Sequence, residues 1–329
     1  MKKLLSIITL ILLTNCLFSQ KIHSPSEIFK LLENSPIAYN IKILKESISE
    51  KDYSEKLNSN NFYRVITDSS IYTMGYKNNN PFFNRAEELF QTSKDSALYL
   101  YKLAYDADTT MYLALTYTGQ LLDILGDRNG AMDYYKKAIS RNYIDFMAHW
   151  FLADDYLLDG DVRKAVDEIV IAQILNRNNP RVKKSMKQIF AKAKIKTEDW
   201  YFNPQVRIQE QPNKSILVEM SENWFGYGSA KALWDFEPGY SASMGVDSGQ
   251  ISTLEYRECL ISQVIAQENK KANIKKYPQL RVLQDAAKNN FLDEYILYEI
   301  ILPENPFVAY QLPEKTILSI KDYILKVRK

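Results

Sequence analysis

Apolar positions along the chain predict a mainly helical protein. From residue 78 to about 195, and again in 254–272, 280–302 and 314–329, apolar side chains recur at the spacing of one helix face. Glycine and proline are scarce, which favours long regular elements over a loop-rich fold. We therefore expect most of the chain to form packed helices, with short strands near its beginning.

The sequence from 21 to 77 predicts a small α+β region. Ser24-Pro25-Ser26-Glu27 has the composition of a helix start, and Ser35-Pro36 ends that helix. Apolar and polar residues then alternate over 37–43, as they do in a half-buried strand, and 62–66 suggests a second strand. The run 78–81, Asn-Asn-Asn-Pro, is a natural boundary.

The middle of the chain contains an internal repeat with a period of 34 residues. The matching pairs are Gly126 with Gly160, Asp127 with Asp161, Ala131 with Ala165, Ala138 with Ala172, Gly119 with Ala153, Leu122 with Tyr156, and Tyr135 with Ile169. A glycine after one helix and an aspartate before the next cap a helical hairpin. The alanines allow close approach of helices.

These small-residue and glycine positions resemble the tetratricopeptide repeat (TPR) family over residues 112–179. An earlier repeat is expected at 78–111, where Arg85 stands in place of the small residue of the first helix. Pro180 begins a segment expected to form a capping helix through Ala193. The resemblance implies a solenoid of helical hairpins and says little about activity.

Beyond residue 200 the resemblance ends. A short strand is expected over 215–220, and Ser221 is placed to cap a helix that ends at Pro238-Gly239. The fold class expected is mainly α, a TPR-type helical-hairpin solenoid with a small α+β N-terminal region and a helical C-terminal unit. The expected domains are a leader at 1–20, the α+β region at 21–77, repeats with a capping helix at 78–195, and a mostly helical unit at 196–329.

The first twenty residues have the pattern of a secretory signal peptide. Lys2 and Lys3 precede a short apolar run, and cleavage is expected near Ser19 or Gln20. This predicts an exported protein, either of the periplasm or cell envelope or secreted, with no transmembrane helix after signal removal. The exit Leu-Phe-Ser-Gln is similar to signal ends common in Bacteroidetes. A lipid anchor at Cys16 and a buried N-terminal helix are the alternatives.

Charge argues against nucleic acid as a partner. The chain has 42 basic and 40 acidic residues, and loss of the leader's two lysines leaves 40 of each. A balanced chain has no net field that attracts a phosphate backbone. Only Cys259 remains after the leader, so stability must come from packing rather than from an internal disulfide.

No set of residues predicts catalysis, a metal or a cofactor. His23 and His149 are far apart; His23 is expected to be unrestrained and His149 to pack within a repeat. Cys259 lies on an apolar helix face, which favours a buried, inert thiol. Gly226-Tyr227-Gly228-Ser229 lacks the residues of a phosphate loop and suggests close helix contact instead.

Acidic pairs such as Asp154-Asp155 are expected to be solvated surface. Glu219, Glu222 and Glu237 lie near tryptophans in the sequence. An aromatic and acidic cleft around Trp224, Trp234 and Glu237 would make the C-terminal unit an enzyme or a ligand-binding protein. A tryptophan core with acids outside is the other interpretation.

The TPR resemblance implies a protein or peptide partner in a groove lined by the first helices. The expected function is a non-catalytic scaffold or adaptor. The family's groove positions fall on residues of mixed apolar, amide and acidic character, which favours a partly apolar segment with Trp150 as anchor over an acidic tail. Inter-repeat packing is the alternative role for Trp150. The groove residues are Thr116, Gln120, Asp123, Ile124, Trp150, Asp154, Leu157 and Leu158.

Overall fold

A computed structural model describes the fold of the chain in two compact units. The described residues are 22–53, 62–67, 70–76, 79–246, 253–268 and 277–328. The first unit joins Met1–Lys51 to Asp199–Ile300, and the second joins Asp52–Glu198 to Ile301–Lys329. Both the region expected at 21–77 and the one expected at 196–329 are therefore divided between the units, which differs from the predicted domains.

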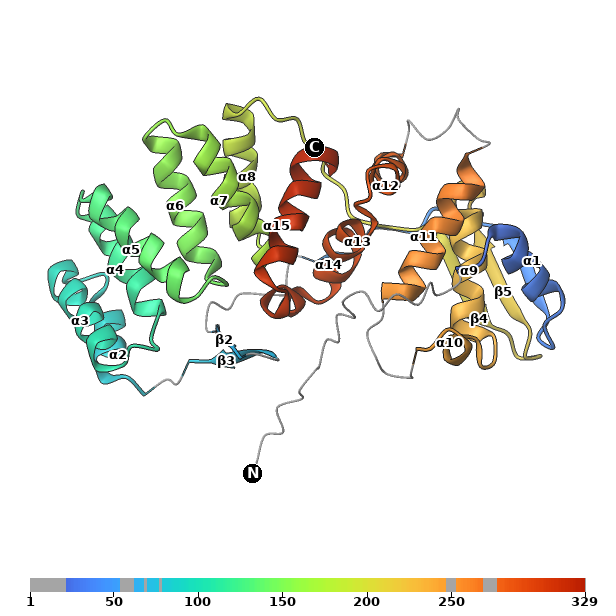
Figure 1. The fold of residues 1–329 in the computed structure, drawn as a ribbon, viewed down its shortest axis with the longest axis horizontal. Helices are drawn as coiled ribbons and strands as arrows, with labels where there is room; N and C mark the ends of the chain where they lie inside the picture. The colour runs from blue at the N-terminus through green and yellow to red at the C-terminus, as the bar shows by residue number, and fades with distance from the viewer. Residues whose placement is uncertain are drawn as a thin grey trace. The chain divides into compact units, whose positions relative to one another are not determined.

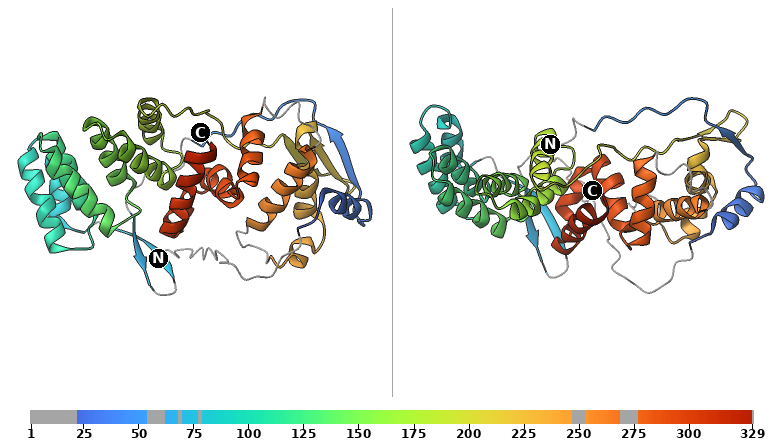
Figure 2. Two further views of the ribbon diagram at one scale, coloured as in Figure 1. Left: turned by 45° about the horizontal axis from the view of Figure 1, so that its top comes forward. Right: turned by 90° about the horizontal axis from the view of Figure 1, so that it is seen from above.

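The second unit is built around a run of antiparallel helical hairpins, as Figure 1 shows. Consecutive helices of this run pack against one another, and two further views in Figure 2 show the same succession. The expected fold class is confirmed: the described chain is mostly helical, with a TPR-like solenoid and a few short strands. The solenoid helices are α2 (Pro81–Leu89), α3 (Lys94–Ala107), α4 (Leu113–Ile124), α5 (Arg128–Arg141), α6 (Phe146–Leu158), α7 (Val162–Leu175) and α8 (Pro180–Lys192).

The residues of the repeat hold the hairpins as expected. Asp127 accepts a hydrogen bond from the Gly130 N–H at 3.0 Å, and Asp161 accepts one from the Lys164 N–H at 3.1 Å. Gly126, between α4 and α5, has φ +93°, a left-handed conformation that favours glycine. The sequence therefore encodes both the end of one helix and the start of the next.

The first hairpin has its small residue one position further along the chain than the 34-residue period predicts. Ala86 of α2 is fully buried with Ala97, Tyr101 and Leu121 in one apolar cluster. Eleven positions separate Ala86 from Ala97, whereas twelve separate Gly119 from Ala131. The expectation that this helix lacks its small residue is wrong, because the small residue of α2 lies one position closer to the first alanine of α3 than the 34-residue period predicts.

A two-stranded hairpin belongs to the solenoid unit. β2 (Phe62–Ile66) pairs antiparallel with β3 (Ile71–Gly75). Asn142, at the end of α5, accepts from the Arg64 N–H at 3.2 Å and donates to the Phe62 carbonyl at 3.1 Å. The strand at 62–66 was predicted; β3 was not.

The C-terminal segment of this unit packs on the second helix of a hairpin. Lys321 of α15 pairs with Asp167 of α7 at 2.7 Å, and the Asn178 amide donates to the Pro303 carbonyl at 2.8 Å. These contacts hold the C-terminal segment against α7 and the turn that follows it. The segment comprises α14 (Leu302–Glu304), η4 (Pro306–Gln311), α15 (Glu314–Tyr323) and η5 (Ile324–Arg328).

The first unit contains a three-stranded sheet with β5 (Ile216–Met220) at its centre. β1 (Tyr39–Ile43) runs parallel to β5, and β4 (Val206–Glu210) runs antiparallel to it. The predicted strands at 37–43 and 215–220 are confirmed. One face of the sheet is apolar because alternate residues of each strand point to the same side.

Three helices pack together in this unit: α1 (Pro25–Glu33), α9 (Phe225–Phe236) and α11 (Thr253–Gln267). A Cβ on Gly228 of α9 would lie 2.8 Å from the Met220 sulfur, and one on Gly226 would lie 2.4 Å from the Ser262 carbonyl oxygen. The close helix contact expected at 226–229 is thus confirmed, against both β5 and α11. Ser24 and Glu27 form the capping box of α1.

The remaining helices of the unit are shorter than expected. The single helix predicted over 280–302 is broken at Asn290, which has φ +60°. The helix expected over 254–272 ends at Gln267, and its last four expected residues lie outside the described part of the chain. These shorter elements are η1 (Glu222–Trp224), α10 (Tyr240–Ser243), α12 (Pro278–Lys288), α13 (Leu292–Tyr295) and η3 (Ile296–Ile301).

Candidate functional site: the first-helix face of the solenoid

The candidate site is the side of the solenoid formed by the first helix of each hairpin, called here the first-helix face. Asp123 and Ile124 of α4 are exposed on it, and so is Leu158 of α6. Ile124 is 48% exposed and Leu158 is 64% exposed. The two helices thus present apolar side chains beside an acid.

The C-terminal segment of the unit does not bury these residues. Its longest helix, α15, packs on α7, which is the second helix of its hairpin. Ile124 and Leu158 therefore remain exposed with the segment in place. This leaves the first-helix face accessible to another molecule.

Thr116 does not belong to this face, so that part of the predicted groove is wrong. Its side chain is fully buried, and its hydroxyl donates to Asp145 Oδ2 at 2.6 Å. Asp145 is the N-cap of α6 and accepts from the Met147 and Ala148 N–H groups. Thr116 therefore joins two hairpins and is unavailable to a ligand.

Trp150 of α6 lies half-buried on the face. Its ring packs on Phe151 with centroids 5.3 Å apart. Its indole nitrogen is buried and makes no hydrogen bond of good geometry, and Gln120 Oε1 on α4 is likewise buried without a donor in the described chain. The Trp150 side chain is partly covered by its neighbours and partly exposed to solvent, so it packs within the solenoid and also presents surface to a ligand.

Asp154 connects α6 to α8. The Ser185 hydroxyl of α8 donates to Asp154 Oδ1. Burial raises the pKa of the Asp154 carboxyl; the Ser185 hydroxyl and the nearby Trp150 indole oppose that rise, and the charge of Asp123 adds to it. Asp123 and Asp154 therefore lie close enough to interact, although they come from successive hairpins. Leu157, also predicted for the groove, is half-buried.

Asp155 lies below the surface of this cluster. It is 2% exposed, and its closest cation is the Arg128 Nε, 3.8 Å from Oδ1. Burial, followed by the charge of Asp123, raises the pKa of Asp155 to about 7. The expectation of a solvated acid is wrong for Asp155, because it is buried beside Arg128 and Tyr135 of the preceding hairpin.

The aromatic and acidic residues of the first unit do not form the alternative cleft. Trp224 is 2% exposed and packs edge-on against Phe202 and Tyr227, at 5.6 and 5.7 Å between centroids. Glu237 accepts from the Ser35 hydroxyl at 2.6 Å and from the Tyr39 hydroxyl at 3.0 Å. Trp224 therefore belongs to the hydrophobic core, and Glu237 is hydrogen-bonded to the N-terminal segment.

Trp234 is hydrogen-bonded to a different acid, the buried Glu258. Its indole nitrogen donates to Glu258 Oε2 at 2.7 Å, and the Tyr240 hydroxyl donates to the same oxygen at 2.9 Å. The His23 backbone N–H donates to Glu258 Oε1 at 2.8 Å, and the His23 ring lies 3.0 Å from that oxygen. His23 was expected to be unrestrained, which is wrong. Glu258 is fully buried and recruits these donors.

The other singled-out residues are structural. His149 is buried between Glu168 Oε2, at 2.6 Å, and the Tyr143 carbonyl oxygen, at 3.0 Å, as a packing histidine would be. Cys259 is fully buried, and burial raises the pKa of its thiol. Glu219 pairs with Arg207 of the neighbouring strand at 3.4 Å. Among the described residues, no group of three or more His, Cys, Asp or Glu is arranged to hold a metal ion.

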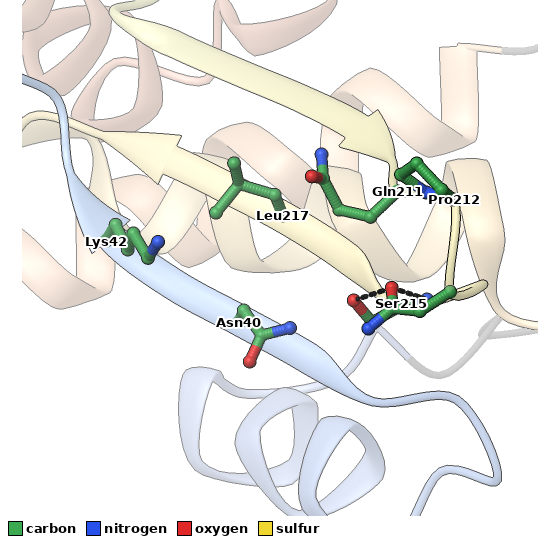
Figure 3. A pocket seen from close by; sticks show the side chains of 7 residues that line it. Asn40, Lys42, Gln211, Pro212, Ser215 and Leu217 are labelled. Atoms are coloured by element: carbon green, nitrogen blue, oxygen red, sulfur yellow. Dashed lines mark hydrogen bonds between the residues drawn. The ribbon is translucent and has the colours of Figure 1, made fainter.

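A shallow hollow of about 430 Å³ lies on the open face of the sheet in the first unit. Figure 3 shows Asn40 and Lys42 on β1 beside Leu217 on β5, with Gln211 and Ser215 at the β4–β5 turn. The Ser215 hydroxyl donates to Asn213 within this turn. The hollow is polar and wide open, and no buried group points to a particular ligand there.

Over the described part of the chain, no helix has the length and hydropathy needed to span a bilayer. The predicted leader, including Cys16, lies outside the described residues. The structure therefore leaves the anchor at Cys16 as a prediction.

Comparisons with known proteins find similarity to solved structures over about a third of the chain. No protein-family model and no curated protein matches the chain. The first TPR of Spaghetti (RPAP3), solved with an HSP90 peptide, is 17% identical with a TM-score of 0.33, covering 34% of this chain and 90% of that one. The Yersinia enterocolitica chaperone SycD, solved with a peptide of YopD, is 18% identical with a TM-score of 0.32, covering 34% and 92%. Because these similarities span a third of the chain, assignment of the site rests on its own residues.

Proposed function

We propose that this protein is an exported, non-catalytic scaffold that holds a segment of another protein on its first-helix face. The observation that carries the proposal is the exposure of Ile124 and Leu158 beside the half-buried Trp150. Apolar and aromatic side chains on a rigid helical surface supply most of the energy of typical protein interfaces. The unit's own C-terminal segment leaves this surface open.

The proposed location rests on the sequence of the leader. A basic start, a short apolar run and a small-residue exit direct a bacterial chain to the export machinery. The mass of the mature N-terminus tests this directly. Cleavage near Ser19 or Gln20 supports export without an anchor, an acylated Cys16 shows a lipoprotein, and an intact Met1 contradicts export.

A crosslinked pull-down from the native cell envelope tests the scaffold function. The variant combines Trp150→Ala, Asp154→Lys and Leu158→Ala, and the control carries Tyr99→Ala on the second helix α3. Tyr99 is as exposed as Leu158, at 64%. We expect a partner with the native protein and the control and none with the variant. A folded, abundant protein that captures nothing in any form contradicts the proposal.

A further inference from the structure

We propose that the solvent-facing side of the capping helix α8 binds the surface of a membrane that contains anionic phospholipids. The surface concerned, called here the basic face, consists of exposed cations on α8 and on the few residues that follow it. The inference goes beyond the scaffold function, because it assigns a second surface and a partner that is not a protein. The residues of the basic face are Arg181, Lys184, Lys192, Lys194 and Lys196.

The first argument is the segregation of charge within a balanced chain. The stretch 180–196 holds seven cations and no acid, although the whole chain has 42 basic and 40 acidic residues. The neighbouring helices α3, α5 and α7 each carry both signs of charge. Protein surfaces normally intersperse the two signs, and a surface of one sign attracts the opposite charge. The excess of positive charge on α8 therefore indicates an anionic partner.

The second argument is that the protein does not use these cations internally. All five residues of the basic face are exposed, and within the described chain no ion pair joins any of them to an acid. By contrast, Lys136 of α5 and Lys164 of α7 each pair with an aspartate three residues earlier, at 3.7 and 2.7 Å. The charges of the basic face are therefore available to another molecule.

The third argument is the arrangement of the cations around the helix. At 3.6 residues per turn, Arg181, Lys184 and Lys192 lie on one side of α8, along a row of about 16 Å. The opposite side, with Val182 and Ile189, is buried where α8 packs on α7 and α6. The helix thus has no apolar side left to insert into a bilayer. Its contact is limited to attraction by an extended surface of negative groups.

The kind of cation favours a membrane surface over a partner with fixed phosphates. Six of the seven cations in 180–196 are lysines. A lysine ammonium is a point charge, whereas the planar fork of arginine suits paired recognition of phosphates and carboxylates. Polybasic segments bind anionic leaflets through such point charges, without a fixed register. The choice of a membrane over nucleic acid also rests on the proposed export, which the leader supports.

The test is co-sedimentation of the purified mature protein with lipid vesicles. One set of vesicles mixes phosphatidylglycerol with phosphatidylcholine, and the other contains phosphatidylcholine alone. We expect the protein to bind the anionic vesicles and not the neutral ones. Binding should be lost as the ionic strength rises from about 0.01 M to about 1 M, because the screening length then falls from about 30 Å to about 3 Å.

Two variants with the same net charge locate the binding surface. We expect affinity for the anionic vesicles to fall about a hundredfold or more in the variant of the basic face, and by less than about tenfold in the control. Glutamine has nearly the helix propensity of lysine and arginine, so both variants should fold. The variant carries Arg181→Gln, Lys184→Gln, Lys192→Gln and Lys196→Gln. The control alters exposed cations of α3, α5 and α7: Lys102→Gln, Lys136→Gln, Lys137→Gln and Arg163→Gln.

A charge-conserving variant distinguishes electrostatic binding from a structural role of the lysines. Lys184→Arg with Lys192→Arg and Lys196→Arg keeps every charge and should keep the affinity of the native protein. Loss of binding in this variant, with the fold intact by circular dichroism, contradicts the inference.

Other outcomes also overturn the inference. They are equal binding to neutral and anionic vesicles, binding to neither, and a control that loses as much affinity as the variant. Tighter binding to duplex DNA than to anionic vesicles in the same buffer would show that the basic face serves nucleic acid instead. The scaffold function is tested separately, by partner capture at the first-helix face, so failure of either proposal leaves the other standing.

Discussion

At the scale of single residues, Asp155 shows how burial changes the role of an acid. Its pKa in the folded chain is about 7, compared with 3.8 for the unperturbed group. A raised folded pKa means that the stability contributed by the protonated form is present at low pH and is lost as pH rises from about 4 to 7. Charged Asp155 therefore destabilises the solenoid at neutral pH.

Asparagine at this position should remove the penalty. We expect Asp155→Asn to raise the free energy of unfolding at pH 8 by about 1–2 kcal/mol, after discounting for solvent screening, and to leave it unchanged near pH 4. Urea unfolding followed by circular dichroism at both pH values measures the difference. Asp159→Asn, on the exposed turn that follows α6, is the control and should change little. An Asp155→Asn protein less stable than the native chain at pH 8 would refute this account.

Several side-chain roles were beyond prediction from the sequence. Thr116 falls at a groove position of the repeat pattern, yet its hydroxyl binds the Asp145 cap of the next hairpin. His23 and Glu258 are 235 positions apart, so their contact depends on tertiary structure. The helix caps Asp127 and Asp161 were predictable because their partners lie three residues away. Local contacts could thus be inferred, and distant ones could not.

At the scale of elements, the crossing of α9 and α11 depends on a glycine. A Cβ at Gly226 would lie 2.4 Å from the Ser262 carbonyl oxygen, a backbone atom that cannot rotate away. We expect Gly226→Ala to destabilise the first unit by about 1–3 kcal/mol, as overpacking does. Chemical unfolding monitored by tryptophan fluorescence measures it, with the surface substitution Lys45→Ala as control. Equal stability of the two variants would mean that the helices are not in close contact.

Elements were predictable where a periodic pattern defined them. The 34-residue spacing located α4 to α7, and alternation located β1. The break in 280–302 was not predicted, because apolar spacing continues across Asn290 while the backbone there turns left-handed. Parallel pairing of β1 with β5 was also not predictable, since nothing in either strand specifies a partner 177 positions away.

At the scale of the whole molecule, each unit is assembled from two distant segments. The segment 22–43 supplies α1, β1 and the His23 contact to Glu258 in the first unit. Its removal should expose one edge of β5 and leave Glu258 without two of its donors. We expect a chain lacking 22–43 to lose hydrogen-exchange protection in α9 and α11 while α4 to α7 keep theirs.

A matched deletion distinguishes this effect from general damage. Removal of 314–328, the last helices of the second unit, should affect α7 and leave α9 and α11 protected. Full protection of α9 and α11 after loss of 22–43 would show that the first unit folds without its N-terminal segment. The units could not be delimited from the sequence, because composition changes at residues 78 and 200 do not reveal which distant segments pack together.

The central claim is that a partner binds the first-helix face of the solenoid. A photo-crosslinking amino acid placed at Leu158, and separately at Tyr99, tests it most directly, because both side chains are 64% exposed but lie on first and second helices respectively. Illumination of the native envelope should yield a partner adduct from position 158 and none from 99. Adducts at 99 alone, or equally at both positions, would contradict the account.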